Sequence, residues 1–532
     1  MRSGHRAPPQ THRRPSGSSE RPGHPRRTGR ALPNRPGHHI RPTPSTAAPD
    51  ERHTGVTMQS RTDADAHETA DTAFLAELRS RIPAERVLTS GPEYTRAVAL
   101  FNAAVDVRPS VVVRCASTAD VQAGVRASRN HGVPLSVRGG GHDFWGRAFR
   151  PGGLVLDLTE MRDVQVDVDH RYATVGGGAL SSDVVSAAER TGLTAVTGTA
   201  GSVGMVGLTL GGGYGPLLGQ FGLAADNLLS AEVVLADGSR VNTDAEHHPD
   251  LFWALRGGGG NFGVVTSARI RLHPVPTVIS GTILYPIDQS AGILADLGGI
   301  LQDSPDELTV DVGFLPGPDG KPTVYVAPTW SGDPEVGNAQ NGPVRTLARL
   351  GTPVLAEIGP VARSATLAAT DAMFPPGRMG AIRTRTVQSV TGSIATVLDR
   401  AAREFTSPFS AIVWHQFHGA ATRPPLGSTA FGRREPHLMV ELISMWENGE
   451  NKDHTSGGAG MPSHLRWLEK THAALEPFSL PGGYVNFLGL ETPDQVANSY
   501  GPNTERLLAV KSAVDPDSVF SATPLPTSTA DA

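Results

Sequence analysis

The sequence predicts an α+β protein with a glycine-rich first part and a second part built on a mixed or antiparallel sheet backed by helices. Three observations support this fold class. A strand–helix–strand pattern runs over residues 111–138. Four glycine clusters follow between Gly139 and Gly263, which are too many for ordinary turns. Residues 276–480 then combine β-branched runs with helical segments, as in a sheet that helices cover.

The first part begins with a β-α-β unit. Val111–Arg114 is a β-branched run and predicts a strand. Ser117, with Asp120 three residues later, forms the capping box of a helix over residues 119–130. Leu135–Arg138 predicts the second strand, which leads into three glycines, a histidine and an aspartate. Successive glycines let the backbone approach a ligand closely and turn its N–H groups toward an anion.

The rest of the first part continues in the same manner. We expect strands at Leu154–Leu158, Ala173–Val175 and Ala231–Ala236. Ser181 or Ser182 is expected to cap a helix that runs to about Arg190.

A G-x-G-x-x-G match at Gly258, Gly260 and Gly263 suggests a Rossmann fold, but its context argues against one. That motif needs a helix after the glycines, so that the helix N-terminus meets a pyrophosphate. Residues 264–272 instead show strand-like alternation. We therefore expect a different nucleotide-binding architecture.

The second part predicts both strands and helices. The expected strands are Gly281–Pro286, Val310–Phe314, Thr323–Thr329, Ala411–Phe417 and His437–Trp446. The expected helices are Asn338–Leu350, Ser393–Arg403 and His464–Leu475.

Composition sets the N-terminus apart from the rest of the 532 residues. Residues 1–57 hold eleven Arg, ten Pro and no aromatic residue and carry a charge of +8, whereas the whole chain carries −5. Such a segment cannot bury enough apolar surface to order itself, so we expect disorder. It is either a basic arm for an acidic partner or an extension without function, with translation then starting at Met58. No apolar stretch follows its Arg pairs, so we expect no export signal and a cytoplasmic protein.

The single Cys of the chain excludes a disulfide framework and a Cys-based zinc site, and we expect no metal. The sequence has no apolar run long enough to span a membrane, and we expect neither a membrane nor a nucleic-acid partner.

Several long motifs in order resemble the FAD-linked oxidases of the berberine bridge enzyme type, in the vanillyl-alcohol oxidase and para-cresol methylhydroxylase (PCMH) superfamily. They span residues 133–142, 207–215, 222–228 and 250–263, with Tyr484-Val485-Asn486-Phe487 and residues 500–503 near the end. The resemblance implies a two-subdomain FAD-binding domain of PCMH type (71–275), a substrate domain (276–480) and a C-terminal berberine-bridge-type segment that returns to the FAD domain (481–525). Outside these we expect the disordered basic tail (1–70) and a short tail (526–532).

The resemblance implies that FAD binds with its pyrophosphate on the Arg138–Asp143 loop, and that His142 bonds covalently to the 8α carbon of the flavin. A histidine that only hydrogen-bonds the flavin is the alternative. The residues implied in cofactor binding are Arg138, Gly139, Gly140, Gly141, His142, Asp143, Gly198, Thr199, Val203, Gly204, Gly207, Gly211, Gly213, Tyr214, Asn227, Gly260, Gly263, Val264, Tyr484 and Asn486.

Many relatives carry a second link through a Cys in a Gly-Thr-Cys segment, where this chain has Ala200. Cys115 lies elsewhere in the motif order, so we expect a single covalent link, through His142, and no cysteinyl link. Val203 falls where relatives place a gate residue, and its small side chain favours reaction with O2; it could equally be a packing residue.

Glu441 is the candidate catalytic base. It is a lone carboxylate in an apolar strand and shares a face with Met439 and Ile443. Such a setting suits a general base near neutrality, although an edge position facing solvent is the alternative. Glu441 also matches the catalytic glutamate of berberine bridge enzyme through a Met-Val-Glu segment. His415 and His418 are further candidates for substrate contact, and strand alternation puts at most one of them in the site.

Several family features are missing. Phe487 stands where relatives have a tyrosine or histidine, Phe144 where they often have a hydroxylated aromatic residue, and Asp143 where serine is usual. The usual Asn-x-Asn is absent after Phe520. These departures put a tyrosinate mechanism and the C-terminal flavin contacts in doubt.

The sequence therefore predicts an FAD-dependent oxidase that moves a hydride from a small organic substrate, a secondary metabolite or a sugar, to flavin N5, with O2 giving hydrogen peroxide. The alternatives are an oxygenase or dehydrogenase on the same fold, or a non-catalytic FAD-binding protein that uses its basic tail on an acidic partner.

Overall fold

The structure is a computed structural model that describes residues 72–390, 392–447, 461–489 and 492–527. The described residues belong to one compact unit. The predictions for residues 1–70 and 528–532 lie outside the described residues. The domain boundaries between residues 71 and 525 remain predictions, although the expected boundary at 275/276 falls between two strands that belong to different sheets.

The first sheet has four strands in the order β1-β2-β4-β3: β1 Val87–Leu88, β2 Val111–Arg114, β3 Leu135–Arg138 and β4 Leu154–Asp157. Strands β2 and β3 have the predicted bounds and both run parallel to β4, which lies between them. The predicted capping box of Ser117 and Asp120 begins α3 (Thr118–His131). Helices α1 (Thr72–Arg79) and α2 (Gly91–Ala97) precede it, and α1 packs against α3.

The second sheet has six strands, β5 Val164–Asp167, β6 Tyr172–Gly176, β7 Thr194–Ala195, β8 Leu228–Val234, β9 Arg240–Thr243 and β10 Val264–His273. Their order is β5-β6-β10-β8-β9, with β7 also on β10. Strand β10 begins directly after Gly263, as predicted, so no helix follows the G-x-G-x-x-G match. The helices of this region are α4 Ser181–Glu189, α5 Met205–Leu210, α6 Leu218–Phe221 and α7 Pro249–Ala254.

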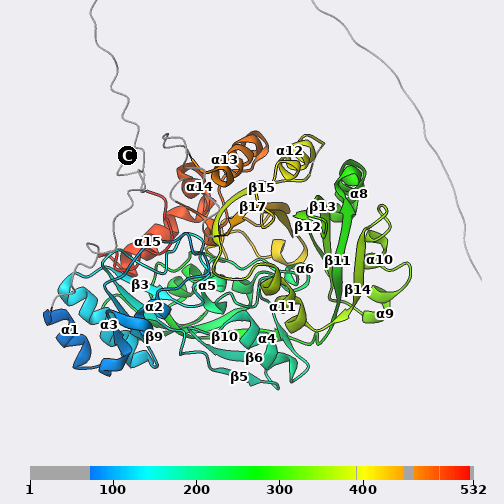
Figure 1. Cartoon of the computed structure of the whole chain (residues 1–532). Helices are drawn as coiled ribbons and strands as arrows, with labels where there is room; N and C mark the ends of the chain where they lie inside the picture. Colours follow the sequence, from blue (N-terminus) through cyan, green and yellow to red (C-terminus); the bar gives the residue numbers. More distant parts are fainter. Residues whose placement is uncertain (1–71, 391, 448–460, 490–491, 528–532) are drawn as a thin grey trace, which may run out of the picture. The chain divides into compact units, whose positions relative to one another are not determined.

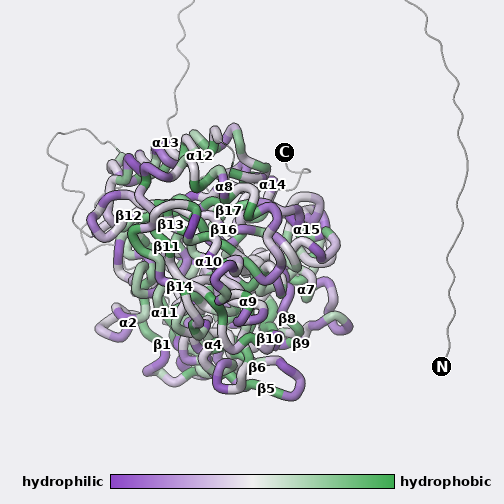
Figure 2. Tube along the Cα trace, turned by 90° about the vertical axis from the view of Figure 1, so that its right-hand side faces the viewer, coloured by the Kyte–Doolittle hydropathy of each residue, from purple (hydrophilic) through white to green (hydrophobic). Residues whose placement is uncertain are grey.

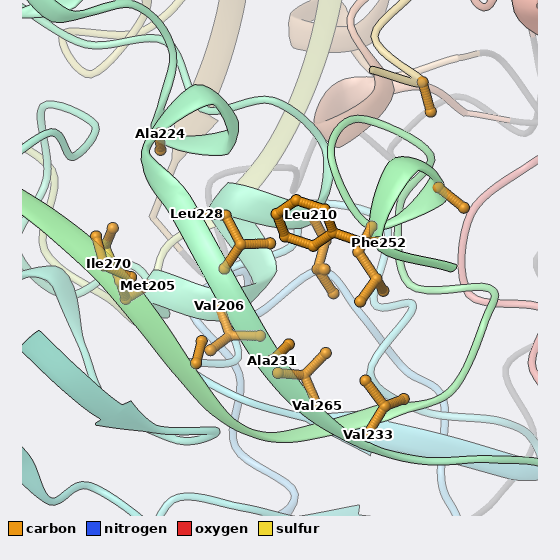
Figure 3. Packing of buried hydrophobic residues seen from close by; sticks show 14 of the residues in the cluster. Met205, Val206, Leu210, Ala224, Leu228, Ala231, Val233, Phe252, Val265 and Ile270 are labelled. Carbon is orange, nitrogen blue, oxygen red and sulfur yellow. The ribbon is translucent and has the colours of Figure 1, made fainter. Parts of the chain in front are cut away.

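Apolar side chains hold this region together. Met205, Val206 and Leu210 of α5 meet residues of β8 and β10, among them Leu228 and Val265 (Figure 3). All five are buried, and burying such side chains is the dominant favourable term in folding. This packing fixes α5, and with it the glycines on either side of that helix.

The prediction that Ser181 or Ser182 caps α4 was wrong. The N-cap is Leu180, whose N–H donates to the Asp183 carboxylate at 2.8 Å. The N–H groups of Ser181 and Ser182 instead donate to carbonyls of residues 203 and 201. The start of α4 is therefore bonded both to the neighbouring glycine loop and to the helix's own Asp183 carboxylate.

The third sheet is antiparallel throughout and has seven strands in the order β14-β11-β13-β12-β16-β17-β15. Their bounds are β11 Val278–Pro286, β12 Leu308–Pro316, β13 Pro322–Trp330, β14 Leu355–Val361, β15 Met379–Val387, β16 Ala411–Phe417 and β17 His437–Trp446. The five predicted strands are all present. Strands β14 and β15 were not predicted from the sequence.

Helices cover one face of the third sheet (Figure 1). They are α8 Ser290–Gln302, α12 Gly392–Arg403 and α13 Ser463–Leu475, the last two close to their predicted bounds. The predicted helix Asn338–Leu350 was wrong. Two short helices, α9 Pro334–Asn338 and α10 Pro343–Leu347, replace it, because proline cannot continue a helix from the preceding turn. Helix α11 (Arg363–Met373) follows β14.

The C-terminal segment contains α14 (Pro493–Asn498) and α15 (Thr504–Val514), and α15 packs against α7. Figure 2 shows hydrophobic residues concentrated in the central strands, among them β16 and β17, where every residue but one is buried. The fold class is α+β, as predicted.

Candidate active site

One large cavity, of about 990 Å³, extends from the glycine loops to the uncovered face of the third sheet. Strands β12, β13, β16 and β17 contribute one face to its wall. Residues of β11, β14, α11 and the C-terminal segment, among them Tyr484 and Asn486, also line it. Most of the predicted site residues line this cavity: Gly139, Gly140, Gly141, His142, Asp143, Gly198, Thr199, Val203, Gly204, Gly207, Tyr214, Gly260, Gly263, Val264, Tyr484, Asn486 and Glu441.

Four of the predicted residues do not line the cavity. Arg138 turns its guanidinium away, where it donates to the Ala97 carbonyl and lies 3.9 Å from the Asp157 carboxylate. Asn227 also points elsewhere, and its amide donates to the carbonyls of Phe221 and Leu223 at 2.9 Å. Both side chains thus hold backbone in place rather than face the cavity.

Gly211 and Gly213, the other two, lie behind cavity residues and position them. The N–H of Gly213 donates to Tyr484 Oη at 3.1 Å. Asn486 packs so closely on Gly211 that a Cβ there would overlap its side chain. Asn486 Nδ2 in turn donates to Tyr484 Oη at 2.8 Å.

Two glycine loops meet at the floor of the cavity. A Cβ on Gly204 would lie 2.6 Å from Gly140 N, so neither loop tolerates a side chain at the crossing. By contrast, a Cβ on Gly207 would have nothing within 4 Å, because this glycine faces open space. The floor is therefore bare backbone, which a flat or phosphorylated ligand can approach closely.

His142 follows the first of these loops. Its ring stacks on Phe101 with a centroid separation of 3.8 Å. Burial lowers the pKa of His142 to about 4, and the carboxylates of Asp371 and Asp143 only partly offset this. The imidazole is therefore neutral at pH 7 and can act as a nucleophile.

The loop after His142 is bonded to the C-terminal segment. The Asp143 carboxylate accepts bonds from the backbone N–H groups of Trp145 and Arg147 at 3.0 and 2.9 Å, and pairs with the Arg147 guanidinium. Trp145 Nε1 donates to the carbonyl of Phe487 at 3.0 Å. Asp143 thus organises this loop, and residues far apart in sequence enclose one end of the cavity.

The only thiol of the chain does not line the cavity. Cys115 is fully buried at the end of β2, in a cluster with Phe74 and Val121, and burial raises its pKa well above the usual value. Ala200 lines the cavity, at the position where many relatives have a cysteine.

Glu441 lies in the interior of the third sheet, not at an edge, because β17 is flanked by β16 and β15. It is 8% exposed and lines the cavity with Met439 and Ile443, the two residues predicted to share its face. The sequence suggested only apolar neighbours for this carboxylate. The structure adds His415, whose Nε2 lies 3.2 Å from Glu441 Oε1.

His415 bridges two carboxylates. Its Nδ1 lies 2.9 Å from Asp311 Oδ1, so Asp311, His415 and Glu441 form a chain across β12, β16 and β17. Burial alone would lower the pKa of His415, but the two carboxylates outweigh it and hold this pKa well above its ordinary value. The ring is therefore an imidazolium that donates from both nitrogens.

His418 does not line the cavity, so of the two candidate histidines only His415 reaches it, as alternation predicted. His418 Nε2 lies 3.2 Å from Thr309 Oγ1. Asp311 was not predicted as a site residue. Alternation along β12 could have placed it on one face, but its pairing with His415 depends on a register that brings Val312 opposite Trp414.

Three tyrosines line the cavity, and burial raises the pKa of each. The pKa of Tyr484 rises to about 12. Tyr214 Oη donates to His437 Nε2 at 2.6 Å, since His437 Nδ1 lies 2.7 Å from the Glu435 carbonyl. These three phenols are therefore neutral at pH 7. Tyr325 was not predicted from the sequence.

Comparisons with known proteins identify the family of this chain. Residues 109–244 match the family described as "FAD binding domain", and residues 483–524 match "Berberine and berberine like". The FAD-linked oxidoreductase aurO of Gibberella zeae is 30% identical over 481 residues, which cover 90% of this chain and 92% of the relative. The chain belongs to the berberine-bridge-type FAD-linked oxidoreductases.

Two solved structures resemble this oxidoreductase over most of their length. The crystal structure of 6-hydroxy-D-nicotine oxidase from Arthrobacter nicotinovorans has a TM-score of 0.73 and 29% identity, and covers 83% of this chain and 97% of its own. Berberine bridge enzyme in complex with (S)-reticuline has a TM-score of 0.75 and 22% identity, and covers 86% of this chain and 100% of its own. The second likeness shows the shared fold.

The cavity of this oxidoreductase fits FAD. The bare backbone at Gly139, Gly198 and Gly207 lets a flat ring approach closely, and the neutral imidazole of His142 lines the same cavity. Among the described residues, no helix is both long and apolar enough to cross a membrane.

Proposed function

We propose that this oxidoreductase is an oxidase that transfers a hydride from a small organic substrate, with Glu441 as the base. The observation that carries the proposal is the position of Glu441. Its buried carboxylate lines the same cavity as the glycine loops and His142, and it is held by His415.

The proposal includes a single covalent attachment of FAD through His142. The neutral imidazole supports it, because an unprotonated ring nitrogen is needed to form the bond. The absence of a thiol in the cavity supports the lack of a cysteinyl link, since Ala200 lines the cavity and Cys115 is buried elsewhere. The backbone of residues 139–141, 198–207 and 260–264 would hold the cofactor.

Bound FAD would supply the redox chemistry, as the acceptor of hydride from the substrate and the donor of electrons to O2, which would leave as hydrogen peroxide. The residues of the chain manage the proton. Glu441 takes a proton from a substrate O–H, N–H or C–H group. One oxygen of the Glu441 carboxylate accepts a hydrogen bond from His415. Asp311 holds His415 from the other side, so the Glu441 carboxylate keeps one orientation. The apolar side chains of Met439 and Ile443 flank Glu441 on the same face of β17.

Oxygen as the acceptor is favoured by Val203. This small side chain lines the cavity and leaves room for O2 beside the cofactor. The similarity to an enzyme named as a nicotine oxidase supports the same choice.

Peroxide stoichiometry tests the proposal. We expect a screen of small amines, alcohols and phenols, read by peroxide release, to find a substrate that yields one peroxide per molecule oxidised. Turnover only with an artificial electron acceptor would favour a dehydrogenase. Oxygen incorporated into the product, without free peroxide, would favour an oxygenase.

A further inference from the structure

Arg363 is a buried cation in the wall of the cavity. It is the first residue of α11, directly after the edge strand β14, and only 1% of its surface is exposed. It lines the cavity together with Val361 and Thr366. The reaction proposed above gives Arg363 no role.

The partners of this guanidinium are neutral. Nη1 donates to Thr366 Oγ1, and Nη2 lies 3.5 Å from Thr197 Oγ1, at the limit of a hydrogen bond. Nε is buried and has no hydrogen-bond partner among the residues that the structure describes. Arg363 therefore keeps unused donor capacity and an unpaired charge.

Arg434, another buried arginine, has the carboxylate partner that Arg363 lacks. Arg434 is 6% exposed and forms two hydrogen bonds of 2.8 Å to the carboxylate of Asp226. A buried charge is costly unless it is paired, and arginine normally finds a carboxylate or phosphate for its planar fork. Arg363 has no such two-point partner in the described parts of the chain.

Negative charges near Arg363 only partly offset the effect of burial on its guanidinium. Burial lowers its pKa to about 10, and the more distant carboxylates of Glu189 and Asp311 counteract this. Glu189 is already engaged, because its Oε1 accepts the backbone N–H of Ser364 at 2.7 Å. Asp311 is bonded to His415. The guanidinium is thus positively charged at pH 7 and lacks an anionic oxygen beside it.

We infer that Arg363 binds an oxyanion of the substrate, so that the natural substrate carries a carboxylate or a comparable anionic oxygen. This inference rests on the proposed function for the identity of the cavity as a substrate site. The bound substrate would supply the anionic oxygen that Arg363 lacks. Arg363 and the chain of Asp311, His415 and Glu441 line the same cavity, so one ligand could contact both.

Binding of benzoate and of its neutral isostere benzamide to the oxidised holoenzyme tests this inference, with the visible flavin spectrum as the readout. We expect wild type to bind benzoate more tightly. Arg363→Met should weaken benzoate binding by about 10- to 100-fold, as expected for a lost charge-assisted hydrogen bond, and leave benzamide within about twofold. Arg363→Lys should recover part of the loss, because it restores the charge without the planar fork.

The matched control is Arg400→Met, the same change at an exposed position of α12, which should leave both affinities unchanged. Equal losses of benzoate and benzamide binding, or no loss of either, would overturn the inference. So would a shift of the flavin midpoint potential in Arg363→Met with unchanged benzoate affinity, because the guanidinium would then face the flavin. If Arg363→Met does not fold, the comparison of Arg363→Lys with wild type decides.

This experiment is independent of turnover. An enzyme that binds benzoate through Arg363 but releases no peroxide with any substrate would contradict the proposed oxidase and leave the oxyanion site standing. An active oxidase that binds benzoate and benzamide alike would do the reverse.

Discussion

His415 Nε2 lies 3.2 Å from Glu441 Oε1 in the wall of the cavity. The two residues are on adjacent strands, where the register places Val413 opposite Glu441 and Met439 opposite His415. They are therefore diagonal neighbours on one face of the sheet, a separation that long side chains can bridge. The contact gives the proposed base a fixed orientation and a charged partner.

Glu441→Gln should separate proton removal from cofactor binding. The amide is isosteric but cannot take a proton, so we expect flavin reduction by substrate to slow by about 10²- to 10⁴-fold. The measurement is anaerobic stopped-flow reduction at 450 nm, with the bound flavin spectrum as the control for folding. An unchanged reduction rate would remove Glu441 from the mechanism.

His415→Asn should change the pH dependence of stability. The pKa of His415 is held above its unfolded value near 6.5, so its contribution is fully present below about pH 6.5 and disappears as the pH rises through the folded-state pKa. Thermal unfolding of wild type and variant should therefore differ most in acid and converge in alkali. The matched control is His418→Asn, because burial lowers the pKa of His418 to about 4 and its contribution has the opposite sign. A wild-type advantage that grows with pH would contradict a protonated His415.

His142→Ala should abolish covalent attachment of the flavin. Acid precipitation of wild type should leave a yellow pellet, since the bond survives denaturation, whereas the colour of the variant should wash out. Cys115→Ser is the control and should keep its colour, because Cys115 does not line the cavity. A colourless wild-type pellet would mean that the flavin is bound without a covalent link.

Gly204→Ala should destabilise the crossing of the two glycine loops. Its φ of −62° suits alanine, so the expected cost comes from the Cβ, which would lie 2.6 Å from Gly140 N. We expect a loss of about 1–3 kcal/mol from overpacking, measured by chemical denaturation. Gly299→Ala in α8 is the contrasting change, because that glycine is exposed with nothing within 4 Å of a Cβ, and we expect a gain of about 0.5–1 kcal/mol. Equal changes in the free energy of unfolding at the two positions would show that the two glycine loops can move apart to admit a side chain.

Local patterns were sufficient for many elements of the fold. Strands β2 and β3 and the capping box of α3 were predicted because each depends on neighbours within a few residues. The strand after Gly263 was also predicted from its alternation. Strand β14 was missed because it contains Gly359 and Pro360. It also lies at the edge of the sheet, where no alternation of burial is required.

The family motifs, the glycine loops, the face of Glu441 and the lack of a second thiol could be predicted, because they depend on residue identity and on periodicity along one strand. Long-range packing was needed to show that Arg138 turns away and that Asp311 and Glu441 enclose His415. It was also needed to show that Arg363 is buried without a hydrogen-bonded carboxylate among the described residues. Asp311 and His415 are 104 residues apart, so their contact depends on the register of β12 with β16. That register results from packing of the whole sheet, which no local pattern contains.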